Sequence, residues 1–356
     1  MSDVTRYRAA IEQVAAHWVD PEHPARAEAV TRTLEAPNRF TASAIHYAVH
    51  QRIETLADLG WEAWLGPPSD PSSSLTVDVW HAGTTPLAGL HDLVAIVGMG
   101  HAYRGALASA SPYLLAAFVD NLCAEAPGVA AEIISRDAVG GSTAALMATP
   151  AEADDEDLEA ALQDAEVPTS RQLIRPSRVG VALIDGHESE SEYEGLAQDM
   201  LAAEGFGARS VRICWAPRDL TPDPLLEAMA QCRGVFPAHD DTPGALQMQQ
   251  AFLEARDQSH AYGDGLEFLV SRGAADVQRP GHVRWTEYDE PREAVQWMHD
   301  QSEMLELVVA RRGLHEKLDT PEDISCVVPG TAHQHFQQLR SVQEAASFVR
   351  GLPTST

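Results

Sequence analysis

Two residue types that many enzyme sites use are almost missing from this sequence. Lys317 is the only lysine, which leaves 24 of the 25 basic residues as arginine, and Asn38 and Asn121 are the only asparagines. Lys317 lies late in the chain, and both asparagines fall at helical patterns rather than in a loop. The composition therefore excludes an early lysine that seats a phosphate and leaves no asparagine amide for an oxyanion loop.

Long apolar runs and paired cysteines are also absent. No stretch approaches the roughly 18 uncharged apolar residues that a membrane-spanning helix needs. The first residues, MSDVTRYRAAIEQ, lack a basic segment followed by an apolar one, so we expect a cytoplasmic protein. The four cysteines have no CxxC spacing, which speaks against a zinc cage and a disulfide framework; they are Cys123, Cys214, Cys232 and Cys326.

Positive charge is scarce, and the formal net charge is -28. Nucleic acid and anionic membranes would be repelled by such a surface, so we expect a small-molecule ligand. Abundant acidic residues with little lysine are typical of an acidic, halophilic proteome, where salt screens the self-repulsion. A GC-rich genome would also replace lysine by arginine, so both explanations stay open.

The order of apolar patterns indicates an α/β protein. At 356 residues the chain exceeds the usual size of one hydrophobic core, which favours two domains. Residues 4–18 predict an amphipathic helix, residues 66–74 a linker, and the chain then alternates between strand and helix patterns, which predicts mainly parallel sheets. The strand candidates are residues 75–79, 179–184, 211–215, 266–270, 283–288 and 305–309.

Several polar patterns invite a metal or nucleotide interpretation that we do not favour. His46 and His50 have i, i+4 spacing but no third ligand at motif spacing, and we interpret them as helix surface. The sequence 239–241 (HDD) predicts a loop or helix cap, and 333–335 (HQH) the start of an amphipathic helix. We therefore predict no metal site.

Gly98, Gly100 and Gly105 resemble part of a dinucleotide fingerprint. The GxGxxG pattern needs a third glycine at position 103, which is Tyr103. The preceding apolar stretch is also too long for a simple strand. A helix C-terminus at Gly98 and Gly100 is the favoured interpretation.

Four further stretches occur together in one order. They are HAGTTPL at 81–87 with GLHD at 89–92, Gly100-His101, VGVALIDG at 179–186, and GFGARSV at 205–211. In this order they resemble the LuxC-type acyl-CoA reductase family of the aldehyde dehydrogenase superfamily. The resemblance covers roughly residues 36–350.

The resemblance implies a fold, a reaction and a cofactor. In that family a cysteine takes an acyl group from a thioester, an asparagine amide stabilises the oxyanion, and a hydride from NADPH releases the aldehyde. The corresponding cofactor-binding positions are Gly83, Thr84, Thr85, Pro86 and Ala106. A homodimer is implied by the resemblance alone.

This chain departs from the family at each key group. The cysteine position holds Ala208, the asparagine position holds Thr84, and the lysine position holds Ala106. The cofactor-side sequence at 148–151 is ATPA, and Pro150 has no backbone N–H to donate.

Two side chains are candidate replacement nucleophiles. Ser210 is close in sequence but would need a general base. Cys214 lies six residues beyond Ala208, about 20 Å along an extended strand. The other three cysteines are predicted to be core residues.

We therefore expect an aldehyde-dehydrogenase-like α/β fold of two domains with mainly parallel sheets. Residues 1–170, completed by about 311–356, would form N-terminal helices and a cofactor-type domain, and residues 171–310 a catalytic-type domain. The favoured function is that of a LuxC-like pseudoenzyme that has lost thioester reduction and retains ligand or partner binding. An active NADPH-dependent reductase that uses other groups, and a noncatalytic subunit of an active relative, remain alternatives.

Overall fold

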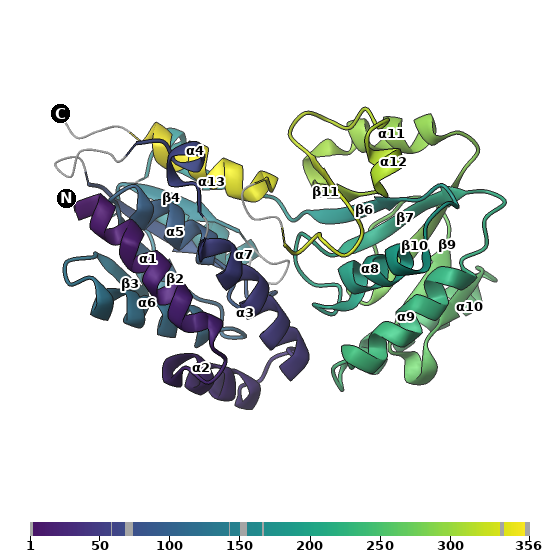
Figure 1. Cartoon of the computed structure of the whole chain (residues 1–356), viewed down its shortest axis with the longest axis horizontal. Helices are drawn as coiled ribbons and strands as arrows, with labels where there is room; N and C mark the ends of the chain where they lie inside the picture. The colour runs from purple at the N-terminus through teal and green to yellow at the C-terminus, as the bar shows by residue number, and fades with distance from the viewer. Residues whose placement is uncertain are drawn as a thin grey trace. The chain divides into compact units, whose positions relative to one another are not determined.

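The computed structural model describes residues 3–57, 59–67, 74–141, 143–149, 155–165, 167–334 and 338–352, which form two compact units. Unit 1 contains the described residues of 1–38, 48–177 and 336–356. Unit 2 contains those of 39–47 and 178–335. Figure 1 shows the helices and strands of both units.

The elements alternate along most of the chain. The helices are α1 (Asp3–Val19), α2 (Pro24–Glu35), α3 (Ala42–Ala57), α4 (Trp61–Trp64), α5 (Leu90–Gly98), α6 (Leu114–Glu125), α7 (Asp155–Asp164), α8 (Glu190–Leu201), α9 (Asp223–Val235), α10 (Thr242–Ala255), α11 (Pro291–Asp300), α12 (Arg312–His315) and α13 (Arg340–Gly351). The strands are β1 (Thr76–Trp80), β2 (Ala102–Ala106), β3 (Ala131–Ile134), β4 (Ala145–Ala148), β5 (Gln172–Ile174), β6 (Val179–Leu183), β7 (Val211–Pro217), β8 (His260–Tyr262), β9 (Leu269–Arg272), β10 (His282–Tyr288), β11 (Leu305–Val309) and β12 (Ser325–Val327).

Unit 1 is built on a five-stranded parallel sheet in the order β3-β2-β1-β4-β5. The chain proceeds from β1 to β3 in one direction and then adds β4 and β5 on the other side of β1. Helix α5 is buried at every position except His91, because it packs against β2 while α1 and α13 cover it. The order of the sheet reverses between β1 and β4, whose carboxyl ends lie side by side.

Unit 2 is built on a seven-stranded sheet in the order β12-β11-β6-β7-β10-β9-β8. All neighbouring strands are parallel except β8 and β9, which are antiparallel. Helices α8 and α9 cover one face, and α11 and α12 the other (Figure 1). Strands β6 and β11 are buried at every position, as expected for parallel strands covered on both faces.

The predicted α/β class with mainly parallel sheets is confirmed. The strands expected at 179–184, 211–215, 283–288 and 305–309 are present as β6, β7, β10 and β11. The strand expected at 266–270 begins later, at Leu269, because Leu266 ends a 3-10 turn with a positive φ of 62°. Part of the linker predicted at 66–74 lies outside the described residues.

From the sequence we expect the chain to return to the first domain at about residue 311. In the structure, residues 311–327 still belong to unit 2, since β12 pairs with β11 through Ser325, Cys326 and Val327. Helix α13 belongs to unit 1 and packs against α5.

Two local predictions have different outcomes. Helix α5 ends at Gly98 and is followed by Gly100 at φ 88°, which confirms the helix C-terminus and removes the dinucleotide-fingerprint alternative. The prediction that a helix starts at 333–335 is wrong for His333 and Gln334, which lie in a turn. In this turn the amide of Gln334 donates to the carbonyl of Thr331. His335 lies outside the described residues.

Candidate functional site

The first candidate site lies in unit 1 at the carboxyl ends of β1 and β4. Ligands of open parallel sheets bind where the strand order reverses, and this is that place in unit 1. The loop after β1 contains the predicted positions Gly83, Thr84 and Thr85, which are partly exposed, and Pro86, which is buried. A Cβ at Gly83 would lie 2.6 Å from the Cβ of Ala108, so glycine is needed for the close approach of the two loops.

A buried polar network supports this loop. The Nε2 atom of His81 lies 2.7 Å from the hydroxyl of Tyr103, and its Nδ1 lies 4.0 Å from a carboxylate oxygen of Asp92. Arg175 donates two hydrogen bonds to Asp92, at 2.9 and 2.6 Å. All four side chains are buried. The network links the ends of β1 and β5 to β2 and α5, so it holds the floor of the site rigid.

The titration state of this network follows from its burial. Burial lowers the pKa of His81 to about 4, so the imidazole is neutral near pH 7. Burial also raises the pKa of Tyr103 well above its usual value. Both side chains are buried, so they support the loop after β1 from beneath. The network could not be predicted from the sequence, because Tyr103 and Arg175 are far from His81 along the chain.

Two guanidinium groups reach the loop after β1. Arg52, on α3, donates to the hydroxyl of Thr85 at 2.8 Å. Arg136 donates to the carbonyl of His81 at 3.2 Å, and its guanidinium carbon lies 4.2 Å from the ring centroid of Trp80. These arginines place positive charge at the carboxyl end of β1 in a chain that has no lysine there.

The other positions that the resemblance predicts for the cofactor side lie at strand ends. Ala106 ends β2 and is completely buried in the core cluster that contains Trp80, Leu146 and Ala148. Thr149 follows β4, and its amide donates to the carbonyl of Trp80. Pro150 and Ala151 lie outside the described residues.

The second candidate site is the turn between α8 and β7 in unit 2, at residues 205–210. Gly205 and Gly207 have φ angles of 74° and 84°, so the backbone makes two left-handed steps that favour glycine. Ala208 follows and is partly exposed. Its side chain is a methyl group and supplies no nucleophile.

Ionic groups hold this turn on both sides. Glu204, at φ 56°, accepts hydrogen bonds of 2.6 Å from both Arg233 and Thr242. Arg209 donates to the carbonyl of His333 at 3.3 Å, and burial lowers its pKa to about 10. The turn is therefore anchored to α9, α10 and the segment after β12.

The two candidate replacement nucleophiles are enclosed. Ser210 has no exposed surface, and its hydroxyl donates to the carbonyl of Phe206 at 2.6 Å. Cys214 is also completely buried, inside β7, and burial raises the pKa of its thiol far above the usual value. Burial likewise raises the pKa of Cys232 to about 11 and of Cys326 to about 12. These thiols stay protonated near neutral pH. They are therefore unreactive, because the thiolate is the nucleophilic form.

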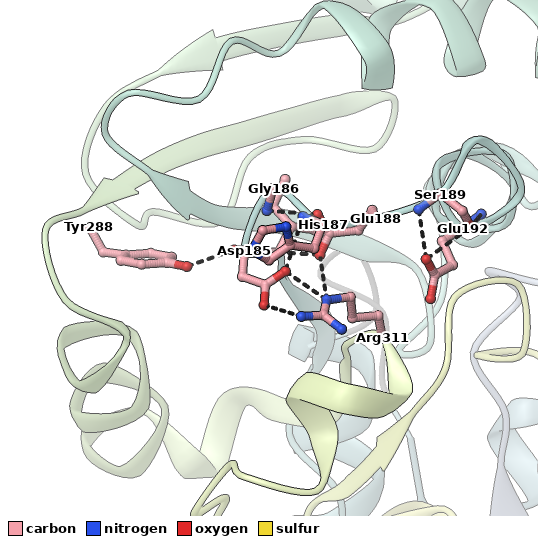
Figure 2. Close-up of polar contacts among 9 residues, drawn as sticks. Asp185, Gly186, His187, Glu188, Ser189, Glu192, Tyr288 and Arg311 are labelled. Carbon is pink, nitrogen blue, oxygen red and sulfur yellow. Dashed lines mark hydrogen bonds and ion pairs between the residues drawn. The ribbon is translucent and has the colours of Figure 1, made fainter.

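A third polar cluster lies at the carboxyl ends of β6 and β11 (Figure 2). Arg311 donates to both carboxylate oxygens of Asp185, at 2.7 and 2.5 Å. Glu188 accepts from the amides of Asp185 and Gly186, and Tyr288 donates to the carbonyl of Ile184. The Arg311 guanidinium lowers the pKa of Asp185, whereas burial raises that of Glu188. These contacts hold the turn from β6 to α8 at the carboxyl ends of the strands. Ala208 precedes β7 and therefore lies at their amino ends.

The predicted metal-binding alternatives are dispersed. His50 pairs with Glu54 at 3.3 Å and His239 lies 3.8 Å from Asp241, both as local contacts. Within the described ranges, no three His, Cys, Asp or Glu side chains gather as a metal site. The same ranges contain no helix long and apolar enough to cross a membrane.

Sequence comparisons give no relative: neither a family model nor a curated protein matches the chain. Solved structures do match. A benzaldehyde dehydrogenase from Corynebacterium glutamicum has a TM-score of 0.67 at 12% identity, and a succinic semialdehyde dehydrogenase from Streptococcus pyogenes, in complex with NADP+, has 0.66 at 12%. Each match covers 92% of this chain and 82% of the other.

Proline utilization A from Bradyrhizobium japonicum matches with a TM-score of 0.65 at 13% identity over 91% of this chain. The chain spans only 38% of the length of that protein. Identities this low show the fold alone. The expected fold class is confirmed: the chain has an aldehyde-dehydrogenase-like fold.

Proposed function

We propose that this protein is a LuxC-type acyl-CoA reductase relative that binds its ligands but has lost thioester reduction. The observation that carries the proposal is the turn at 205–210. Ala208 stands where the resemblance puts the cysteine, and the neighbouring Ser210 and Cys214 are both buried. A thioester carbonyl needs an accessible thiolate or an activated hydroxyl, and these side chains provide neither.

The cofactor proposed for unit 1 is NADPH. The residues fit a phosphate-bearing ligand because Arg52 and Arg136 bring guanidinium groups to the carboxyl end of β1. Arginine binds phosphate oxygens in a fork geometry and can replace the missing lysine in this role. When bound, the nicotinamide would supply a hydride. The chain's own contribution would be binding, through Gly83, Thr84 and Thr85, on the floor that the His81 network holds.

The absence of an oxyanion amide supports the loss of activity. Thr84 offers a hydroxyl where the resemblance implies an asparagine amide. Removing one oxyanion donor typically costs about 10²- to 10³-fold in rate, and removing a nucleophile costs more. Ground-state binding survives such losses, since it depends on other contacts.

The test is titration of the purified protein with NADPH and with straight-chain acyl-CoA thioesters in high salt, followed by absorbance at the NADPH band. We expect saturable binding without NADPH consumption. Consumption that scales with enzyme concentration would contradict the proposal and would direct attention to Ser210 and Cys214, through Ser210→Ala and Cys214→Ala. Failure to bind either ligand would also contradict it and would favour a noncatalytic subunit, which should copurify with a cysteine-bearing relative.

A further inference from the structure

A hollow of about 650 Å³ opens in unit 2 at the carboxyl ends of β7, β9 and β10. Its floor includes Trp215 and Thr286, and its walls include the loop from Gly273 to Asp276 and the side chains of Glu293 and Trp297 on α11. The volume is in the range of small-molecule sites. Ala208 precedes β7, so the hollow and the turn at 205–210 lie at opposite ends of that strand. The proposed function does not use this hollow.

Two neighbouring indole rings, one on the floor and one on a wall, line part of the hollow. The ring centroids of Trp215 and Trp297 lie 5.8 Å apart, with their planes inclined by 57°. Trp215 is held in place by the core under α11, because it packs in the cluster that contains Met298 and Tyr288. The inclined rings form a corner instead of a stack. Indole faces carry negative electrostatic potential and attract cations within about 6 Å.

The charged side chains that line the hollow have a negative net charge. Arg272 pairs with Glu287 at 3.0 Å, and Arg218 pairs with Asp289 at 2.6 Å. Both arginines are thus neutralised by partners. Glu293 and Asp276 remain as exposed lining carboxylates, and neither has an ion pair in the described part of the chain.

Thr286 lines the floor, and its hydroxyl oxygen lies beneath the surface of the hollow. Thr286 is buried, and its hydroxyl has no hydrogen-bond partner among the residues described. A buried hydroxyl without a partner is costly, and a ligand donor that reaches the floor would remove this cost. Rotation about the Cα–Cβ bond to another staggered rotamer would place the Thr286 hydroxyl where its methyl group now lies.

We propose that this hollow binds a small alkylammonium ion, with the cationic nitrogen held between the Trp215–Trp297 corner and the carboxylate of Glu293. An anion is disfavoured, because the two arginines are already paired and the whole chain carries a charge of -28. An aromatic corner with nearby carboxylates is a general arrangement for recognising ammonium groups.

The experiment is a ligand-detected NMR titration of the full chain with n-butylammonium and with tetramethylammonium, each against NaCl at equal ionic strength. We expect saturable binding of at least one ammonium ion that NaCl does not abolish. Preference for n-butylammonium would assign a role to a hydrogen bond with Thr286, and preference for tetramethylammonium would assign recognition to the rings alone.

Variants separate this site from general attraction to an acidic surface. Trp297→Leu should weaken binding about tenfold, and Glu293→Gln about threefold, on the scale of cation–π and single-charge contacts. Glu293 belongs to the capping box of α11, and glutamine is also accepted at that position, so Glu293→Gln should keep the helix start intact. The matched control is Glu227→Gln, an exposed charge on α9, which should leave binding unchanged.

Equal affinity in Trp297→Leu and the parent protein would overturn the proposal, as would equal losses in Glu293→Gln and Glu227→Gln. Binding that never saturates would overturn it too. Thermal unfolding checks that each variant is folded. If Trp297→Leu does not fold, Trp297→Phe with Glu293→Gln carries the same comparison.

Discussion

His81 and Asp199 show how single buried groups couple this structure to pH in opposite directions. Burial lowers the pKa of His81 to about 4 and raises that of Asp199 to about 8. The carboxylate of Asp199 accepts from the amides of Gly330 and Ala332 but has no cation partner in the described ranges. Folding is therefore opposed by acid at His81, where a proton must be excluded, and by base at Asp199, where a proton must be retained.

The His81 effect gives the first prediction. The unfolded imidazole has a pKa near 6.5 and the folded one about 4, so the unfolded state binds more protons and stability falls as the pH drops below about 6.5. At pH 5 the His81 contribution is about 2 kcal/mol less favourable than at pH 7.5. The measurement is urea unfolding of the parent protein and of His81→Phe at both pH values. The free energy of unfolding should change less between the two pH values in His81→Phe than in the parent, by this amount.

The control for this prediction is His187→Gln, at an exposed position. It should keep the parent's difference between the two pH values. An unchanged difference in His81→Phe would contradict a neutral, buried His81 in the folded state.

At the scale of single elements, α8 is important because it leads from the Asp185 turn to Ala208. Its first residues form a capping box: Ser189 and Glu192 exchange hydrogen bonds between side chain and backbone. This pattern satisfies two amides at the helix start.

We predict that Ser189→Ala lowers the free energy of unfolding by about 1 kcal/mol, the usual value of an N-terminal cap. Ser189→Asp should retain most of it, because aspartate also accepts at this position. The measurement is the midpoint of urea unfolding. A loss in Ser189→Asp as large as in Ser189→Ala would show that the hydroxyl acts otherwise than as a cap.

Elements with strong local patterns could be predicted from the sequence, and the others could not. Strands β6 and β11 are continuous apolar runs, which is what burial on both faces requires. Strand β2 has the sequence AYRGA, with a buried tyrosine and an arginine, and no periodicity identifies it. Its place is set by pairing with β1 and β3.

The candidate sites divide in the same way. Ala208, Thr84 and Ala106 were found through short motifs in order. The His81 network, the Glu204 anchor and the corner of Trp215 and Trp297 join residues that are far apart along the chain. Sequence spacing carries no signal for such contacts, because tertiary folding alone brings them together.

At the scale of the whole molecule, the charge of -28 should make stability depend on salt. Raising KCl from about 0.1 to 1 M shortens the screening length from about 10 to 3 Å and weakens repulsion between surface carboxylates. We predict a higher urea midpoint at 1 M KCl. A triple variant, Glu227→Gln with Glu316→Gln and Glu322→Gln, removes three exposed charges and should depend less on salt. A midpoint that falls with KCl would contradict this prediction.

Our proposal is that the turn at 205–210, where the resemblance puts a cysteine, keeps its backbone but has no nucleophile at Ala208. Its most direct test is intact-mass analysis of Ala208→Cys after incubation with straight-chain acyl-CoA thioesters, beside the parent protein and Ala203→Cys, which places a thiol elsewhere in the partly exposed turn after α8. A thiolate at position 208 would attack the thioester carbonyl and release CoA, leaving one acyl group on the chain.

We predict one acyl adduct, mapped to position 208, in Ala208→Cys and none in the parent protein. Acylation of the parent, or equal rates for Ala208→Cys and Ala203→Cys, would contradict it.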